Sequence, residues 1–361
     1  MYSFEPNEEQ KMLIDAVSRY AENDLRASAE EAEEERKFPN GLIEKGWEMG
    51  ILQASVPEEY GGFGDYSSVT GALAAEELAY GDLAGALAVM TPNLYVLPIL
   101  LTGSEEQKKE FIPPVIEMEW KAYTAALIEP SFDFDATDLK TTAVADGDDF
   151  VLAGHKTYVP FAADAEAMIV YANLDGVTHG FIVPAASDGL VVSEDRNKLM
   201  SLNAIPFYDV SLNDVRVSRT NHLEGDFEAA LAASRVALAS LAIGVAKASL
   251  DYAIDYAKER EVFGVKVAQK QAIAFMMAEM AVEIEASRML TWEAAWKLDA
   301  DKEDANQSAY FAATSAIDMV MMVTDRGVQI LGGHGYIRDH PVERWIRNGR
   351  GFATFTGLAI V

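Results

Sequence analysis

The sequence predicts an α+β protein in which a β-rich section separates two helical sections. The first section carries apolar side chains at the three- and four-residue spacing of amphipathic helices. The middle section changes to short β-rich runs bounded by Asp, Gly and Pro, and long helical patterns then return. We therefore expect three domains: an N-terminal helical domain (1–121), a middle antiparallel β-barrel domain (122–223) and a C-terminal four-helix bundle (224–361).

The first helices begin at recognisable signals. Asn7 is a good N-cap, and the acidic Glu8 and Glu9 behind it favour the first turn of a helix. Further along, Val56-Pro57-Glu58-Glu59-Tyr60-Gly61-Gly62 predicts a turn, because proline and two glycines interrupt any regular pattern. The apolar run after this turn predicts a helix over 68–80.

The strands and the later helices follow from the period of the apolar positions. Four runs rich in β-branched and aromatic residues predict strands, at 150–154, 167–171, 180–184 and 209–215. Patterns of helical period predict the four helices of the last section, at 227–259, 265–297, 304–332 and 340–350.

Composition excludes several classes of function. The 361 residues include 58 acidic and 29 basic side chains, a formal net charge of −29, which disfavours nucleic acid and anionic membranes as partners. There is no cysteine, so disulfides and thiolate-ligated metals are excluded, and the five histidines lack metal-ligand spacing. The first residues show no signal-peptide pattern, and the sequence predicts no apolar run long enough to span a bilayer. We therefore expect a cytoplasmic protein.

A set of residues in the last section is informative by its order and spacing. It consists of Arg260, Phe263, Gln271, Gln329, Gly332 and Gly333. Taken singly, these residues fit a salt-bridged arginine on a helix and a glycine turn that ends one. Together they resemble the flavin-binding signature of the acyl-CoA dehydrogenases, and the resemblance extends over nearly the whole chain.

In that family, the signature residues reach across a dimer interface to the ADP half of a neighbouring subunit's FAD. The resemblance implies that Arg260 forks onto the diphosphate oxygens and that the Gly332–Gly333 backbone approaches the same anion. It also implies that Phe263 packs on the cofactor and that Gln271 and Gln329 hydrogen-bond it. We call this set the trans half of the FAD site.

The own-subunit flavin pocket of the family is altered in this chain. Its loop, normally Thr-Glu-Pro-Gly-x-Gly-Ser-Asp, corresponds to residues 127–135, in which Glu129-Pro130 is kept. Ile128 stands in place of the flavin-contacting threonine, and Asp133 and Phe134 replace a glycine and a serine. A phenyl ring would fill space that substrate needs, and a carboxylate would repel reduced flavin or CoA phosphates.

A second flavin-packing motif is altered too. The family's usual Lys-x-Trp-Ile-Thr-Asn corresponds to Lys156-Thr157-Tyr158-Val159-Pro160-Phe161. Tyr158 still offers an aromatic face, whereas Pro160 has neither a hydroxyl nor a backbone N–H. These concerted changes indicate a lost pocket rather than ordinary drift.

The catalytic base is missing from both positions that the family uses. Dehydrogenation at the α and β carbons needs a carboxylate to remove the α-proton, and such a base contributes roughly 10²–10⁴-fold. The resemblance places that glutamate at Thr356 or, in some members, on the helix 227–259 at Ser234. A hydroxyl cannot act as this base at neutral pH. We therefore predict no catalytic residue in this chain.

The preferred hypothesis is a non-catalytic subunit of a heteromeric, FAD-dependent acyl-CoA dehydrogenase. Heterotetramers of this kind are known in the family, and some act on steroid-derived CoA thioesters, which suggests lipid or steroid catabolism. The expected partners are a homologous catalytic subunit, an acyl-CoA substrate in the complex and electron-transferring flavoprotein as the acceptor.

Two alternatives stay open. An active homotetramer would need a relocated base, for which Asp133 and Asp135 are the candidates. The second alternative is a flavin-free scaffold or an acyl-CoA-binding protein. In that case Arg260 would not bind a cofactor. The final helix that follows this turn in the family is absent after Phe355-Thr356-Gly357, which suggests a truncated sequence.

Overall fold

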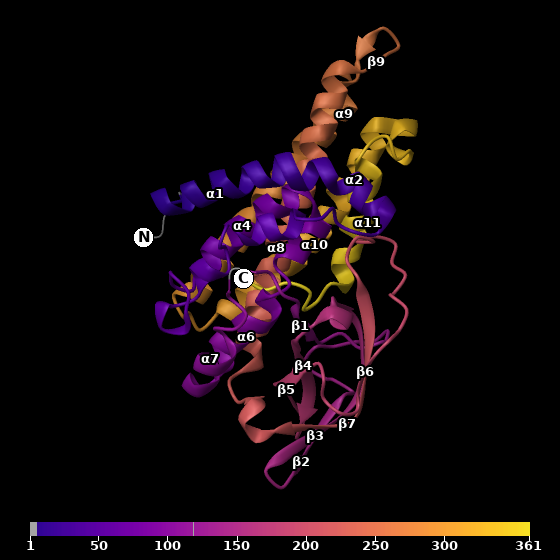
Figure 1. The fold of residues 1–361 in the computed structure, drawn as a ribbon. Helices are drawn as coiled ribbons and strands as arrows, with labels where there is room; N and C mark the ends of the chain where they lie inside the picture. Colours follow the sequence, from indigo (N-terminus) through magenta and orange to yellow (C-terminus); the bar gives the residue numbers. More distant parts are fainter. Residues whose placement is uncertain (1–5, 118) are drawn as a thin grey trace.

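The computed structural model describes residues 6–117 and 119–361, and its first part is helical. The Asn7 side chain accepts a hydrogen bond from the Gln10 backbone at the start of α1, as the N-cap pattern predicts. α1 continues through a π-helical turn into α2, so these two helices form one long rod (Figure 1). The helices are α1 (Glu8–Tyr20), α2 (Arg26–Glu35), α3 (Leu42–Trp47), α4 (Ser68–Gly81), α5 (Leu83–Val89), α6 (Asn93–Thr102) and α7 (Glu105–Phe111).

The middle section forms an eight-stranded sheet. Its order is β6-β7-β3-β2-β4-β5-β8, with β1 beside β4. The strands are β1 (Tyr123–Ala126), β2 (Thr142–Asp146), β3 (Asp149–Pro160), β4 (Ala167–Leu174), β5 (Val177–Pro184), β6 (Leu190–Val192), β7 (Phe207–Ser218) and β8 (His222–Leu223).

The sheet is mixed rather than wholly antiparallel as the sequence suggested. β1 pairs with β4 in parallel, from Tyr123 opposite Ala167 to Ala126 opposite Val170. β2 also meets β4 in parallel at Thr142. Parallel neighbours need a long connection, and the loop after β1 together with the β2–β3 hairpin provides one. The other neighbouring strands pair antiparallel, as predicted.

The last section contains four helices, as predicted: α8 (Phe227–Glu259), α9 (Gln271–Asp299), α10 (Ala305–Leu331) and α11 (Val342–Gly351). α9 begins later than the expected residue 265, because a hairpin of β9 (Glu261–Val262) and β10 (Val265–Lys266) precedes it. The turn residues of this hairpin, Phe263 and Gly264, have φ of 56° and 78°. These are left-handed values, which do not occur within a right-handed helix. The hairpin lies at the far end of α9, away from the sheet (Figure 1).

α8 is the central helix of the molecule. α4, α9 and α10 all pack against it, and nearly every side chain from Val236 to Ala246 is buried. Contrary to the sequence-based expectation, α8 is long and apolar enough to span a bilayer, as is the bent pair α5–α6 if it counts as one span. The apolar window of α8 is 89% buried inside the protein, which is typical of a core helix.

Candidate cofactor and active site

The first part of the trans half lies where α8 ends. Arg260 caps α8, and its backbone N–H donates to the Tyr256 carbonyl at 2.8 Å. Phe263 lies at the tip of the hairpin and is 93% exposed. Gln271 is the first residue of α9 and is also exposed. These side chains therefore face outward rather than into the core of their own chain.

The second part of the trans half lies at the end of α10, where Gln329, Gly332 and Gly333 are exposed. One hydrogen bond joins this turn to α8, because the Tyr256 hydroxyl lies 2.8 Å from His334 Nδ1. Tyr256 is one helical turn before Arg260. The fold thus brings the arginine and the glycine turn, which are distant in sequence, to the same end of the bundle.

The glycine turn has the geometry of an anion cradle. Gly332 has φ of 60° and ψ of −130°, a conformation that side chains rarely adopt. A Cβ atom added at Gly332 or at Gly333 would meet nothing within 4 Å, so the backbone is open to a ligand. An open backbone and a guanidinium at the same end of the bundle are the kinds of donor that a diphosphate needs. The trans half therefore fits FAD.

The residues of the own-subunit flavin pocket surround a cavity of about 410 Å³. Its walls are largely apolar and aromatic, and include Ile128, Phe134 and Tyr158. Four of the polar side chains that line it already have protein partners: Glu129 with Lys156, Ser131 with Asp133, Thr157 with Asp209 and Thr354 with the Gly351 carbonyl. A flavin ring has a polar edge that loses free energy when buried without partners. A flavin bound here would have to form its polar contacts largely with groups other than these four side chains.

Two residues that the altered motifs retain have a structural role. Glu129 and Lys156 form a buried ion pair at 2.8 Å, with their side chains 5% and 0% exposed. Glu129 also accepts hydrogen bonds from the backbone N–H groups of Lys140 and Thr141. Burial lowers the pKa of Lys156 to about 8, although the carboxylate opposes the shift. From the sequence alone, Glu129 and Lys156 are recognisable only as residues kept in two family motifs, and their ion pair is not predicted.

One of the two expected base positions, Ser234, lines a small cavity, and the other, Thr356, precedes a residue that lines it. Ser234 of α8 lines it together with Gly357, the residue after Thr356, and with Leu94 of α6. The volume is about 20 Å³, enough for one water molecule, whereas small-molecule sites measure roughly 300–1,000 Å³. The Ser234 hydroxyl is buried without a hydrogen-bond partner, and none of the described lining residues is acidic.

The segment after Thr356 fills the space around this cavity. Every residue of 358–361 is buried. Asn93 of α6 donates from Nδ2 to the Ile360 carbonyl at 3.3 Å, and the Tyr66 hydroxyl donates to the Val361 carbonyl at 2.8 Å. The chain's own residues therefore fill the space around the Ser234 cavity.

The candidates for a relocated base are poorly suited to that role. Asp133 and Asp135 are exposed on the loop before β2. A hydrogen bond from Ser131 holds the pKa of Asp133 below its usual range, and the backbone N–H of Thr137 does the same for Asp135. A lowered pKa makes a carboxylate a weaker base at neutral pH.

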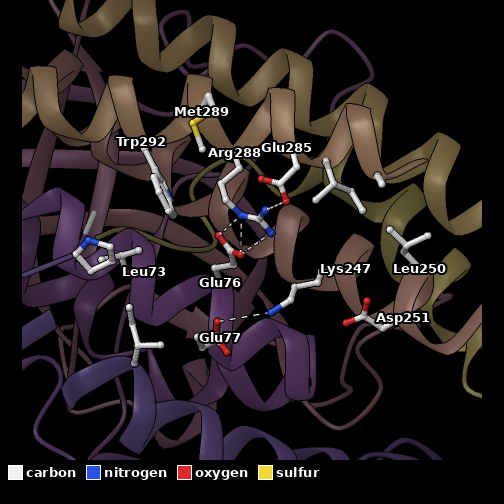
Figure 2. Close-up of a pocket in the computed structure, with 14 residues that line it drawn as sticks. Leu73, Glu76, Glu77, Lys247, Leu250, Asp251, Glu285, Arg288, Met289 and Trp292 are labelled. Atoms are coloured by element: carbon white, nitrogen blue, oxygen red, sulfur yellow. Dashed lines mark hydrogen bonds and ion pairs between the residues drawn. The ribbon is translucent and has the colours of Figure 1, made fainter. Parts of the chain in front are cut away.

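A separate cavity of about 400 Å³ lies between α4, α8 and α9 (Figure 2). Inside it, Arg288 Nε of α9 donates to both carboxylate oxygens of Glu76 on α4, at 3.0 and 3.2 Å. Lys247 of α8 faces Glu77 at 3.9 Å. No residue of the trans half lines this cavity, and two ion pairs, Arg288 with Glu76 and Lys247 with Glu77, join its helices.

Sequence models of three acyl-CoA dehydrogenase domains match this chain: the N-terminal domain over 7–119, the middle domain over 124–215 and the C-terminal domain over 226–359. The chain belongs to the acyl-CoA dehydrogenase family. The fold and the enzyme class implied by the resemblance are thereby confirmed, and the cofactor of this oxidoreductase family is FAD.

Named relatives in the acyl-CoA dehydrogenase family extend over almost the whole chain. The mitochondrial short-chain specific acyl-CoA dehydrogenase of Bos taurus is 34% identical over 361 residues, which cover 96% of this chain and 86% of that protein. Subunit CarC of the caffeyl-CoA reductase–Etf complex of Acetobacterium woodii is 35% identical, covering 98% and 96%. Butyryl-CoA dehydrogenase of Megasphaera elsdenii superposes with a TM-score of 0.89 at 29% identity, covering 99% and 96%.

Proposed function

We propose that this chain is the non-catalytic subunit of a heteromeric, FAD-dependent acyl-CoA dehydrogenase. It contributes the trans half of the FAD site to a homologous catalytic subunit. That subunit supplies the flavin pocket, the acyl-CoA site and the glutamate base. The complex desaturates an acyl-CoA thioester between its α and β carbons.

The observation that carries this proposal is the contrast between the two ends of α8. At the Arg260 end, the signature side chains are exposed and the backbone of the glycine turn is open. At the Ser234 end, the protein closes around about 20 Å³ with no acidic residue in the described lining. A chain with these properties can hold part of a neighbour's cofactor, whereas the cavity beside Ser234 is too small for an acyl group.

Each side chain of the trans half has a task that suits its chemistry. When bound, FAD accepts hydride from the β-carbon of the substrate. Arg260 would neutralise the diphosphate charge, and the Gly332–Gly333 backbone would allow its close approach. The exposed Phe263 ring would pack on the cofactor, and Gln271 and Gln329 would hydrogen-bond it. Thr356 and Ser234 leave the proton transfer to the catalytic subunit.

The setting follows from the family and from one relative. We infer a heterotetramer that works in the cytoplasm, in lipid or steroid catabolism, as the split assemblies of the family suggest. Electron-transferring flavoprotein is the proposed acceptor, because CarC is a subunit of a reductase–Etf complex. The apolar helix α8 is covered by its neighbours, which agrees with a complex that does not insert into a membrane.

Purification with and without the catalytic subunit tests the proposal. Expressed alone, the chain should carry no stoichiometric FAD and should not turn over any acyl-CoA. Co-expressed with a homologous subunit that has Glu at the Thr356 position, it should co-purify as a flavin-containing, active complex. Stoichiometric FAD and turnover by the chain alone would reject the proposal.

Two variants distinguish the alternatives. Arg260→Ala should deplete FAD from the complex, whereas a flavin-free scaffold predicts unchanged FAD content. Asp133→Asn should leave the activity of the complex unchanged. An active homotetramer with a relocated base predicts instead that this variant loses activity and keeps its FAD.

A further inference from the structure

We propose that His334 is a further ligand of the FAD diphosphate, and that Tyr256 is a positioning residue that keeps a proton on His334 Nε2. This inference rests on the proposed function, because the FAD concerned belongs to the catalytic subunit's site. No residue of the sequence signature predicts it: the signature contains the glycines before His334 but not the histidine.

Two tyrosines of α8 hydrogen-bond two histidines of the segment between α10 and α11. The Tyr256 hydroxyl lies 2.8 Å from His334 Nδ1, and the Tyr252 hydroxyl lies 2.7 Å from His340 Nδ1. The two imidazole rings are stacked, with centroids 5.5 Å apart and planes 13° from parallel. Trp345, which is 2% exposed, packs edge-on against Tyr252. The last turns of α8 thus restrain the orientation of both rings.

The hydrogen bond to Tyr256 couples the hydroxyl to the tautomer of the His334 imidazole, because a tyrosine hydroxyl can donate to Nδ1 or accept from it. The form that we assign is the one in which Tyr256 donates, which leaves the proton of a neutral imidazole on Nε2. Within residues 6–117 and 119–361, His334 Nε2 has no hydrogen-bonding protein partner, and the side chain is only partly buried. In this tautomer, His334 presents an N–H donor that no described residue of the protein uses.

The surroundings of this donor indicate the class of its ligand. His334 directly follows the open backbone of Gly332 and Gly333, and Tyr256 is one turn before Arg260. A guanidinium, an open glycine backbone and an imidazole N–H thus gather at one end of the bundle. Phosphate oxygens only accept hydrogen bonds, so a diphosphate matches three donors and selects the Nε2-protonated form.

The pair formed by Tyr252 and His340 offers an internal control. It repeats the tyrosine–imidazole bond of Tyr256 and His334 at nearly the same length. His340, however, does not adjoin the glycine turn. If the tyrosines only fasten the loop to α8, their removal should have equal effects. If Tyr256 sets the proton of a ligand, only its removal should weaken FAD binding.

The test measures FAD affinity in the complex of this chain with its catalytic subunit. The complex is stripped of FAD, and FAD is titrated back while flavin fluorescence is followed. His334→Ala should raise the dissociation constant roughly tenfold, the loss expected for one hydrogen bond to a charged group. Tyr256→Phe should raise it roughly threefold by the loss of tautomer control, and Tyr252→Phe should leave it unchanged.

A conservative rescue separates ligand binding from packing. His334→Gln supplies an N–H donor without any help from Tyr256, so its dissociation constant should stay near the wild-type value. Adding Tyr256→Phe to His334→Gln should then have no further effect. Thermal unfolding of the FAD-free complexes serves as the folding control, with midpoints expected to be equal for His334→Gln and the wild type.

The outcomes separate this inference from the proposed function. If Arg260→Ala weakens FAD binding while His334→Ala binds FAD as the wild type does, His334 is not a ligand and only this inference fails. Equal effects of Tyr256→Phe and Tyr252→Phe would likewise reduce the cluster to a packing role. If Arg260→Ala leaves FAD binding unchanged, the proposed function fails, and the inference fails with it.

Discussion

The two ends of α8 differ in how open their surroundings are. Near its start, Ser234 faces a cavity of about 20 Å³ without a hydrogen-bond partner. At its end, Arg260 stands exposed beside an open glycine turn. The distance between these two residues is roughly 39 Å, at the rise of an α-helix. No side chain spans that length, so the two ends serve different sites and can change independently.

Under the proposed function, that separation would let one chain lose catalysis and still serve an enzyme. In a site built from two subunits, each subunit contributes one half, and a chain can keep the half that it gives to its neighbour. The charged pair that survives at the altered flavin pocket, Glu129 with Lys156, then needs a reason other than flavin binding. Its burial and its hydrogen bonds supply that reason.

The largest effect on stability is expected when the ion pair between Glu129 and Lys156 is broken. Lys156→Ala leaves Glu129 as a buried carboxylate with only backbone donors, which should lower the free energy of unfolding by about 3–5 kcal/mol. Chemical denaturation of the purified chain measures it. Lys140→Ala, at an exposed ion pair on the same loop, should change stability by less than about 0.5 kcal/mol. Equal effects would mean that the pair is not structural.

Substitution of two glycines, one near each end of α8, allows the stability effects at the two ends to be compared. Gly357 has φ of 79°, and a Cβ there would lie 2.4 Å from Leu127 Cδ2. Gly357→Ala should therefore destabilise the chain by about 2–4 kcal/mol, from strain and overpacking together. Gly332→Ala has the strain without a clash and should cost about 1–2 kcal/mol.

The effects of the two variants on FAD retention by the complex should be in the opposite order to their effects on stability. Gly332→Ala should weaken it, because the new Cβ enters the open space that the diphosphate approaches. Gly357→Ala should weaken it only as far as it unfolds the chain. Thermal melts of the chain and flavin fluorescence of the complex measure the two effects, and parallel losses in both would contradict the separation of the two ends.

Acid should weaken the contact between α2 and α11. Arg347 of α11 pairs with Glu33 of α2 at 2.5 Å, and Asn203 donates to the same carboxylate at 2.7 Å. Although burial opposes ionisation, these partners hold the pKa of Glu33 below its usual value of 4.5. The unfolded chain then binds more protons in this range, so the contribution of Glu33 is present above pH 4.5 and is lost as pH falls through the folded pKa.

The variant Glu33→Gln tests this prediction. At pH 7 it should lose about 1.5–3 kcal/mol of unfolding free energy, and the gap to the wild type should close as the pH drops below the folded pKa. Urea unfolding at several pH values gives the curve. A gap that stays constant with pH would show that ionisation of Glu33 does not contribute.

The smallest effect is expected from restoring the base. Thr356→Glu puts a carboxylate back at the family position, yet the adjoining cavity of about 20 Å³ has no room for an acyl group. Turnover of short-chain acyl-CoA by this variant alone should therefore not exceed that of the wild type, as followed by dye reduction. Activity of the variant in the range of ordinary family members would show that the site is open in solution.

Much of the fold could be predicted from the sequence, because it depends on the period of apolar residues. α8 begins and ends as expected, whereas α9 starts late because two residues of positive φ, Phe263 and Gly264, form a hairpin that the apolar period does not reveal. The parallel pairing of β1 also escaped prediction, since it depends on contacts between distant segments. The bond between Tyr256 and His334 is likewise a contact of the fold and not of the sequence.

The central claim is that this chain gives half of an FAD site and holds no FAD of its own. The most direct measurement is the flavin-to-protein ratio, from absorbance and quantitative protein analysis, for the chain alone and for its complex. We predict essentially no FAD on the chain alone and one FAD for each pair of unlike chains in the complex. One FAD for every copy of this chain, purified without a partner, would contradict the account.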